Sequence, residues 1–204
     1  IKDVSGESLS PDWMRDRLEK SDIKSINLLV DITNYILLEQ GQPLHAFDKD
    51  KLNKLVGREV TEIDFGIRKA NNEESLIALD GKNYQLNNNV TVVTCDDKPI
   101  AIAGIIGSLE TSVSDTTKDI FIEAAVFNPS IIRKSSKEIG LRTESSSRFE
   151  KGISSKNTIN AVRRTITLIS KFFKVPEVNL YSSKNFKTID NKIKLRRERI
   201  HEIL

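Results

Sequence analysis

A hydroxyl, a carboxamide and an imidazole lie within thirteen residues near the start of the chain. Thr33 and Asn34 fall in a run of otherwise mostly apolar residues, and His45 follows a glycine and a proline. Polar groups in such a setting must find partners within the protein or bind a ligand. An imidazole beside them can serve as a general base or an orienting donor. A lone histidine is also often structural, and Asp48 is then the candidate partner that fixes its tautomer.

Glu123 offers a second kind of chemistry, because it is a carboxylate with only apolar or small neighbours. It interrupts a run, 120–127, that otherwise consists of Ile, Phe, Ala and Val. Burial of an unpaired carboxylate costs on the order of several kcal/mol. Glu123 is therefore either a strand-edge side chain that reaches water or an acceptor for a donor on a ligand.

Two further segments combine glycine with short side chains. Gly104 and Gly107 flank two isoleucines at the end of an apolar run, which is typical of a tight turn at a strand end. Their GxxG spacing also occurs in RNA-binding KH loops, but the helix pattern of that module is missing here. Thr143 and Ser145 follow Gly140 in a polar segment that we interpret as a capped, solvated loop. Four charged residues around it are expected to form a structural ion-pair network: Arg142, Glu144, Arg148 and Glu150.

Composition excludes several classes of protein. With 204 residues, 38% hydrophobic and 30% charged, the chain is typical of a globular protein of one large or two small domains. The single Cys95 excludes an internal disulfide, suits the cytosol and, with two histidines, argues against a dedicated zinc site. The apolar runs are too short for a membrane span or a signal peptide. No Gly-x-Ser-x-Gly elbow and no phosphate-binding glycine loop is present, which argues against a serine hydrolase and an ATP site.

The net charge of +3 permits a contact with a phosphate backbone without requiring one. The excess lysine and arginine gather late, between residues 184 and 199. A solvated basic face is the alternative interpretation.

The pattern of apolar residues predicts an α/β fold with a mixed, largely antiparallel sheet packed by helices. Ser10 is expected to cap a first helix that has Pro11 at its first position. Gly41 and Pro43 end the second helix. We expect helices at 28–40, 129–138, 155–174 and 194–204, hairpins at 76–86 and 90–106, and strands at 60–67 and 120–126.

Four segments together resemble the beta subunit of bacterial phenylalanine–tRNA ligase, in its editing module. They agree with that family in order and spacing, and they cover nearly the whole chain: 33–48, 101–107, 121–129 and 140–152. The resemblance implies a three-layer, sandwich-like editing domain over residues 1–190. It also implies that residues 191–204 begin the next domain of the beta subunit. The start at Ile1 rather than Met separately leads us to expect that the chain is a piece of a longer protein.

The same resemblance implies roles for the polar residues. Asn34 and His45 would hold a water near the scissile ester, with Thr33 at the polar end of the substrate. Glu123 would accept the phenolic hydroxyl of a misattached tyrosine. The other substrate-binding residues implied by the family are Pro43, Leu79, Ala103, Gly104, Gly107, Thr143 and Ser145. The family often has glycine where this chain has Ser108, and alanine where it has Ser145.

The activity implied is post-transfer editing, the hydrolysis of tyrosine from phenylalanine transfer RNA, tRNA(Phe). The resemblance further implies a cytoplasmic alpha2-beta2 heterotetramer with the ligase alpha subunit, and no membrane association. ATP and Mg are expected only at the synthetic site on the alpha subunit, so this chain should need no cofactor and no metal. The alternatives are a non-catalytic module that binds tRNA or a subunit, and a scaffold with a decayed site.

Overall fold

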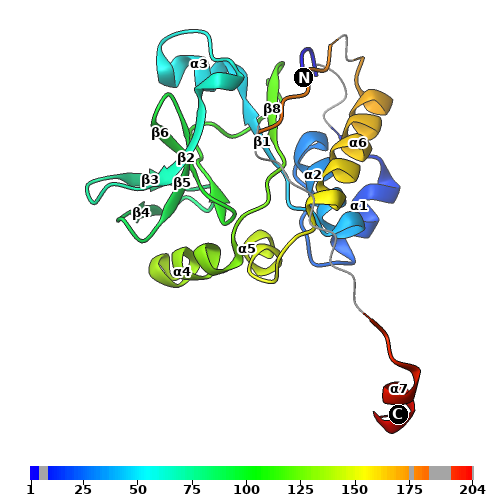
Figure 1. Cartoon of the computed structure of the whole chain (residues 1–204). Coiled ribbons are helices and arrows are strands. Elements are labelled where there is room, and N and C mark those ends of the chain that lie inside the picture. The colour runs from blue at the N-terminus through cyan, green and yellow to red at the C-terminus, as the bar shows by residue number, and fades with distance from the viewer. Residues whose placement is uncertain (5–8, 175–176, 184–193, 204) are drawn as a thin grey trace.

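The computed structural model describes residues 1–4, 9–174, 177–183 and 194–203, and it combines helices with small antiparallel sheets (Figure 1). The helices α1, α2 and α6 lie together on one side of the sheets, with α4 and α5 below them in this view and α3 above. The helices are α1 (Asp12–Glu19), α2 (Leu28–Gln40), α3 (Lys49–Val56), α4 (Pro129–Ile139), α5 (Glu144–Phe149), α6 (Ser155–Phe172), α7 (Arg197–Ile203) and a 3-10 turn, η1 (Glu62–Asp64).

Every strand pairing in the described part of the chain is antiparallel. Four strands form a sheet in the order β2-β5-β6-β7, and two smaller sheets pair β1 with β8 and β3 with β4. The strands are β1 (His45–Asp48), β2 (Phe65–Lys69), β3 (Ser75–Ile77), β4 (Asn83–Gln85), β5 (Thr91–Cys95), β6 (Lys98–Ile102), β7 (Ile106–Gly107) and β8 (Ile120–Glu123). Isolated bridges connect Phe47 of β1 to Ser112, and Ala78 to Ser108, the residue that follows β7 of the larger sheet.

Three clusters of buried apolar side chains hold these elements together. The first lies between α1, α2 and α6 and also contains Ile120 of β8. The second joins β5 and β6 to α4 and α5, with Ile132 and Phe149 at its centre. The third packs α3 against β1, β5 and β6 around Phe47. The strand pair β1–β8 therefore lies at the boundary between a helical cluster and the larger sheet.

Local sequence signals explain most of the element boundaries. α2 begins at Asn27, whose side chain accepts from the Val30 N–H, and ends at Gly41 with φ 69°. The predicted hairpin around Gly81 is confirmed as β3–β4. The predicted Ser10 cap is wrong. Pro11 is the N-cap of α1 and makes no side-chain bond, while the Ser10 hydroxyl donates to the distant Asp31 carboxylate at 2.5 Å.

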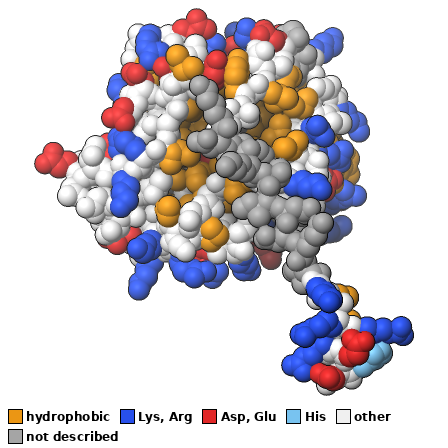
Figure 2. Space-filling model, in the orientation of Figure 1, with side chains coloured by type: hydrophobic (Ala, Val, Ile, Leu, Met, Phe, Trp, Pro, Cys, Tyr) orange, Lys and Arg blue, Asp and Glu red, His pale blue; other side chains and the backbone are white. Residues whose placement is uncertain are grey.

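The mixed, antiparallel α/β class predicted from the sequence is confirmed, whereas the three-layer arrangement stays a prediction. The expected domain boundary at 190 lies outside the described residues. No helix in the described ranges is both long and apolar enough to cross a membrane. On the face shown in Figure 2, hydrophobic side chains gather near the middle, and Lys and Arg side chains lie along the lower and right-hand edges.

Candidate functional site

The strand pair β1–β8 brings His45 and Glu123 opposite one another. Their Cα atoms are direct partners in the antiparallel register, although 78 residues separate them in sequence. Directly opposed side chains of an antiparallel pair project from the same face of the sheet. One face therefore carries an imidazole and a carboxyl side by side.

The His45 ring is enclosed, and its Nε2 atom has no hydrogen-bond partner in the described part of the chain. The ring meets Phe47 edge-on, with centroids 4.5 Å apart. A Cβ atom added to Gly107 would lie only 2.3 Å from Nε2, so only glycine leaves room for the imidazole at this place. Burial lowers the pKa of His45 to about 4, which keeps the ring neutral at physiological pH.

Leu79 lies beside this contact. Its N–H donates to the carbonyl oxygen of Gly107 at 3.0 Å, and its side chain is 45% exposed. The segment that follows β3 is thus hydrogen-bonded to Gly107 of β7, the residue against which the His45 ring packs. The structure therefore brings four of the predicted site residues together: His45, Glu123, Gly107 and Leu79.

Glu123 has no hydrogen bond and no ion pair through its side chain among the described residues. The residue is half-buried, and removal from water raises the pKa of its carboxyl from 4.5 to about 7. No cation compensates for this burial. Close to neutral pH the Glu123 carboxyl therefore exists as a mixture of its charged and neutral forms, opposite a neutral imidazole.

Asp48 is not the partner of His45, so this alternative from the sequence is wrong. Its carboxylate accepts from the Lys51 N–H as the N-cap of α3 and from the Thr117 hydroxyl at 2.5 Å. Residues three apart on a strand point to opposite faces of the sheet. Asp48 serves the start of α3, and the imidazole stays without a carboxylate partner.

A buried amide, Gln42, holds the strands of the site in place. Its Nε2 donates to the carbonyl oxygens of Pro43 and Ala125, both at 3.0 Å, and its Oε1 accepts from the Thr158 hydroxyl at 2.7 Å. Pro43, itself buried, lies two residues before His45, and Ala125 lies two residues after Glu123. One fully buried side chain therefore connects both strands to α6.

The sequence analysis did not single out Gln42. The available signal was a long polar side chain between a helix-ending glycine and a proline, in a segment that is otherwise apolar. That pattern indicates that the amide turns inward. It does not say which elements the amide joins.

Thr33 and Asn34 lie on α2, which packs beside β1. The Thr33 hydroxyl donates to the Val30 carbonyl oxygen within the same helix, at 2.7 Å. The Asn34 amide is half-buried and forms no hydrogen bond within the described ranges. Within the described residues, no hydrogen bond joins Thr33 or Asn34 to His45, so the helix supplies a free amide close to the strand but no preformed network with the imidazole.

Gly104 occupies a left-handed turn between β6 and β7, with φ 68°. A Cβ atom there would lie 2.9 Å from both Ile132 and Phe127, and 3.1 Å from Phe149. Its N–H meets no acceptor among the described residues. The preceding Ala103 is fully buried in the cluster around Phe47, so it supports this turn and has no exposed surface.

Thr143 and Ser145 lie at the start of α5, so the segment predicted as a loop is partly helical. Thr143 is the N-cap, and its hydroxyl donates to the Ile105 carbonyl oxygen at 2.8 Å, next to Gly104. The four charged residues expected to form one ion-pair network form two separate ion pairs instead. Arg148 pairs with Glu144 at 2.6 Å, whereas Arg142 lies 3.8 Å from Glu150.

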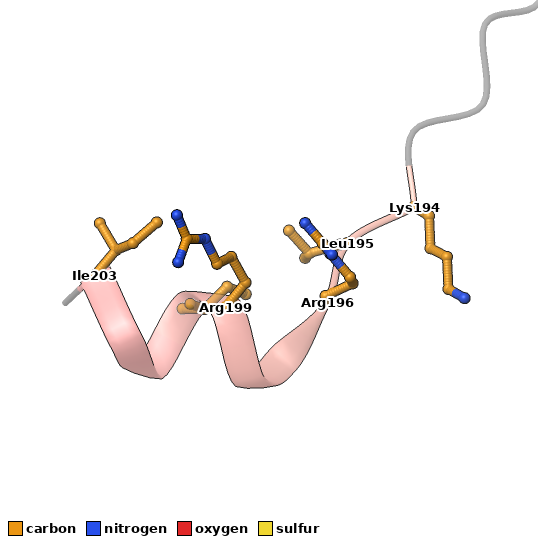
Figure 3. Close-up of a pocket in the computed structure, with 6 residues that line it drawn as sticks. Lys194, Leu195, Arg196, Arg199 and Ile203 are labelled. Carbon is orange, nitrogen blue, oxygen red and sulfur yellow. The ribbon is translucent and has the colours of Figure 1, made fainter.

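A shallow pocket at α7 is distinct from this site. It is lined by Lys194, Leu195, Arg196, Arg199, Ile200 and Ile203, none of which is a predicted site residue. Figure 3 shows Leu195, Arg199 and Ile203 on the same side of the short helix. α7 buries none of its residues, and it lies apart from the other elements in Figure 1. The amphipathic helix predicted at the end of the chain is thus confirmed.

The geometry at β1–β8 can bind a group that donates a hydrogen bond to a half-buried carboxyl, beside a neutral imidazole that can accept one. This geometry can be compared with that of known protein families. The chain belongs to the B3/4 domain family, whose model matches residues 1–174.

The relatives specify the class more closely. Over its whole length the chain is 64% identical to the phenylalanine–tRNA ligase beta subunit of Prochlorococcus marinus strain MIT 9312. It is 62% identical to the beta subunit of Prochlorococcus marinus subsp. pastoris, and 41% identical to that of Synechococcus sp. strain CC9605. The chain spans about 25% of the length of these relatives. The resemblance inferred from the four sequence segments is confirmed.

Proposed function

We propose that the chain hydrolyses the ester that joins tyrosine to phenylalanine transfer RNA, and so removes an amino acid that was attached in error. The observation that carries this proposal is the half-buried carboxyl of Glu123, which has no side-chain partner among the described residues and lies opposite His45, whose Nε2 atom also has none there. Buried polar groups in folded proteins are usually hydrogen-bonded, so a carboxyl and an imidazole without protein partners support a ligand site at this place.

The carboxyl would select tyrosine by its phenolic hydroxyl. A tyrosine bound here donates to Glu123, whereas phenylalanine leaves the carboxyl without a donor, which carries the full penalty of an unsatisfied buried group. A synthetic pocket shaped for phenylalanine cannot strongly reject the same ring with an added hydroxyl, so a second site that requires the hydroxyl is useful.

Recognition of the ring would also use the turn between β6 and β7. The free N–H of Gly104 would donate to the phenolic oxygen, while Glu123 accepts from the phenolic hydroxyl, and Ser145 would lie at the mouth of the same region. The apolar wall would come from Leu79 and Pro43. The contact between Thr143 and the Ile105 carbonyl keeps this turn at a fixed distance from α5.

The attacking water would be activated by the residues around His45. His45 is neutral, so its ring can accept a proton from a water that attacks the ester carbonyl. The Asn34 amide can hold the water or the ribose, and Thr33 the polar end of the amino acid. We assign shared positioning roles, because the described residues show no side-chain hydrogen bond that would orient His45 or Asn34 as a dedicated base.

The test compares deacylation of tRNA(Phe) charged with tyrosine and with phenylalanine. Glu123→Ala should slow tyrosine release about 10- to 100-fold, equivalent to about 1.5–3 kcal/mol for a hydrogen bond to a charged group. Phenylalanine release should stay constant or rise. Glu73→Ala, which removes an exposed carboxylate, is the matched control. An unchanged ratio of the two rates would assign selectivity to another residue.

The relatives' names support further proposals about the setting of this activity. They are beta subunits of a ligase, so we infer that the chain works with the alpha subunit, in an alpha2-beta2 assembly in the cytoplasm, and receives tRNA(Phe) charged there. In this scheme ATP and Mg act only at the synthetic site of the alpha subunit.

A further inference from the structure

The longest helix, α6, differs from all other described helices in its charge. Residues 155–174 contain five lysine or arginine residues and no aspartate or glutamate. Each of the other described helices carries at least one carboxylate. The whole chain has a net charge of only +3. The positive charge is thus concentrated on α6 and is not spread evenly over the protein.

Most of these cations are exposed and unpaired. Arg164 alone forms an ion pair, with Glu39 at 3.0 Å. Lys156, Arg163 and Lys171 have no ion pair among the described residues; the Lys171 ammonium lies 5.6 Å from the centre of the adjacent Phe172 ring. These three cations therefore need no partner within the domain and remain available for an external anion.

The exposed cations share one face of the helix with polar donors. The positions 156, 160, 163, 167, 171 and 174 recur every three or four residues, which places them along one stripe. Lys156 and Lys171 are separated by about 22 Å at the rise of an α-helix, which is long enough to follow several phosphates of one strand. The exposed amide of Asn160 lies within the stripe. Lysine, arginine and asparagine are the side chains that proteins use for phosphate and sugar contacts.

The first turn of α6 is attached to the candidate site. The Asn157 amide donates to the Gln40 carbonyl oxygen at 2.6 Å, and the Thr158 hydroxyl donates to Gln42 at 2.7 Å. Gln42 in turn bonds the carbonyl oxygen of Pro43, two residues before His45. A strand that lies along α6 therefore has one end at the turn that leads into the site.

We propose that the exposed face of α6, defined by Lys156, Asn160, Arg163 and Lys171, binds the sugar–phosphate backbone of the transfer RNA whose charged end enters the site. This inference rests on the proposed function for the identity of the RNA. Figure 2 shows Lys and Arg side chains along the edge of the molecule where Figure 1 places α6.

An acidic protein surface is the competing partner for such a stripe, and the composition of the stripe disfavours it. The buried centre of a protein–protein interface is apolar and depleted of lysine. The exposed part of α6 carries one large apolar side chain, Ile159, which is 39% exposed. Dispersed cations around hydroxyl and amide donors fit a phosphate backbone better.

The test is the salt dependence of RNA binding by the 204-residue chain. The triple variant Lys156→Gln, Arg163→Gln, Lys171→Gln keeps good helix formers and removes three charges. A matched control, Lys54→Gln, Lys69→Gln, Lys82→Gln, removes three exposed charges from α3, β2 and the β3–β4 turn, on the opposite side of the molecule; none of the three forms an ion pair with a described residue. Uncharged tRNA(Phe) is titrated with each protein between 50 mM and 1 M salt.

We expect the α6 triple variant to flatten the slope of log K against log salt by about 2, and to weaken binding about 10- to 100-fold at 0.1 M salt. The control triple should bind as wild type does. Equal losses in the two triples, or no binding by the wild type at 50 mM salt, would overturn the proposal. Unchanged RNA binding with weakened association of the alpha subunit would overturn it in favour of a protein partner.

A second readout separates this proposal from the proposed function. Release of tyrosine from charged tRNA(Phe) is measured below and above saturation. The α6 triple should raise KM and leave kcat unchanged. If wild type binds RNA through α6 but releases no tyrosine, the proposed function fails and the RNA face stands. If tyrosine is released with the same KM by both triples, the RNA face fails and the function stands.

Discussion

Two carboxylates, Asp31 on α2 and Glu123 on β8, differ in the hydrogen bonds that the protein supplies to them. Asp31 is fully buried and accepts three hydrogen bonds, from the hydroxyls of Ser10 and Ser25 and from the Ile26 N–H. Glu123 is half-buried and accepts none from the described residues. The first carboxylate connects the loop before α2 to the helix. The second contributes no internal bond to the fold.

The difference indicates which carboxylate serves stability and which serves binding. Burial of a charged group is tolerated when hydrogen bonds replace its water, as they do at Asp31. At Glu123 the cost of burial remains and appears as a raised pKa. A side chain that destabilises the empty protein can be compensated when a ligand supplies the missing donor.

The largest expected effect is on Asp31. Replacement by alanine should lower the free energy of unfolding by about 2–4 kcal/mol, because it leaves the buried Ser10 hydroxyl and two partly buried donors, the Ser25 hydroxyl and the Ile26 N–H, without an acceptor. Urea unfolding followed by circular dichroism measures this loss. The same substitution at Asp50, an exposed carboxylate in the first turn of α3, is the control and should stay within about 0.5 kcal/mol. Similar losses at the two positions would abolish the comparison.

Glu123→Gln should act in the opposite direction and depend on pH. The folded pKa of about 7 lies above the ordinary value of 4.5, so wild type loses stability as pH rises from 4.5 to 7 and stays lower above pH 7. The neutral variant should match wild type at pH 4. It should be more stable by about 1–2 kcal/mol at pH 8, within an upper limit of about 3 kcal/mol. A pH-independent difference would show that Glu123 has an internal partner.

Gly107→Ala should disturb the imidazole without removing it. The added methyl carbon would overlap the His45 ring, so the ring must move, at a cost of about 1–3 kcal/mol in stability. Release of tyrosine should fall more than it does in Gly81→Ala, which strains a turn but meets no neighbouring atom. Thermal unfolding and deacylation are measured on both proteins. Normal release in a folded Gly107→Ala protein would show that the position of the ring does not matter.

The smallest effect expected is a change in selectivity with pH. The charged carboxylate is the stronger acceptor for the tyrosine hydroxyl, so the ratio of tyrosine to phenylalanine release should rise between pH 6 and 8, as Glu123 loses its proton. We expect a rise of about three- to tenfold. His45 stays neutral over this range and adds no dependence. The rise should vanish in Glu123→Gln, and its persistence there would assign it to another group.

Much of the fold was predictable because its signals are local. Gly41 ends α2, Asn128 and Pro129 begin α4, and Gly140 ends it, as the sequence indicates. The prediction that Ser10 caps α1 was wrong because the partner of Ser10 is distant in sequence. Its hydroxyl could cap the helix beside it, but it bonds Asp31, 21 residues away, because a buried carboxylate is the stronger acceptor.

The site was predictable in part. Glu123 stands out because its neighbours are apolar, and His45 because histidine is rare in this chain. That the two are opposed depends on the register of β1 with β8, and the contact of His45 with Gly107 depends on how two separate sheets meet. Such relations arise from packing between distant segments, which no local pattern encodes.

The hydrogen bonds of Gln42 also have a consequence for the order in which the protein is made. They join residue 42 to residues 83 and 116 positions further along the chain. On the ribosome, α2 and β1 emerge long before Ala125 and Thr158, so until then the buried amide can bond only the neighbouring Pro43 carbonyl oxygen. The hairpins and α2 can form early from near neighbours. The connection of both site strands to α6 through Gln42 therefore cannot form until α6 has left the ribosome.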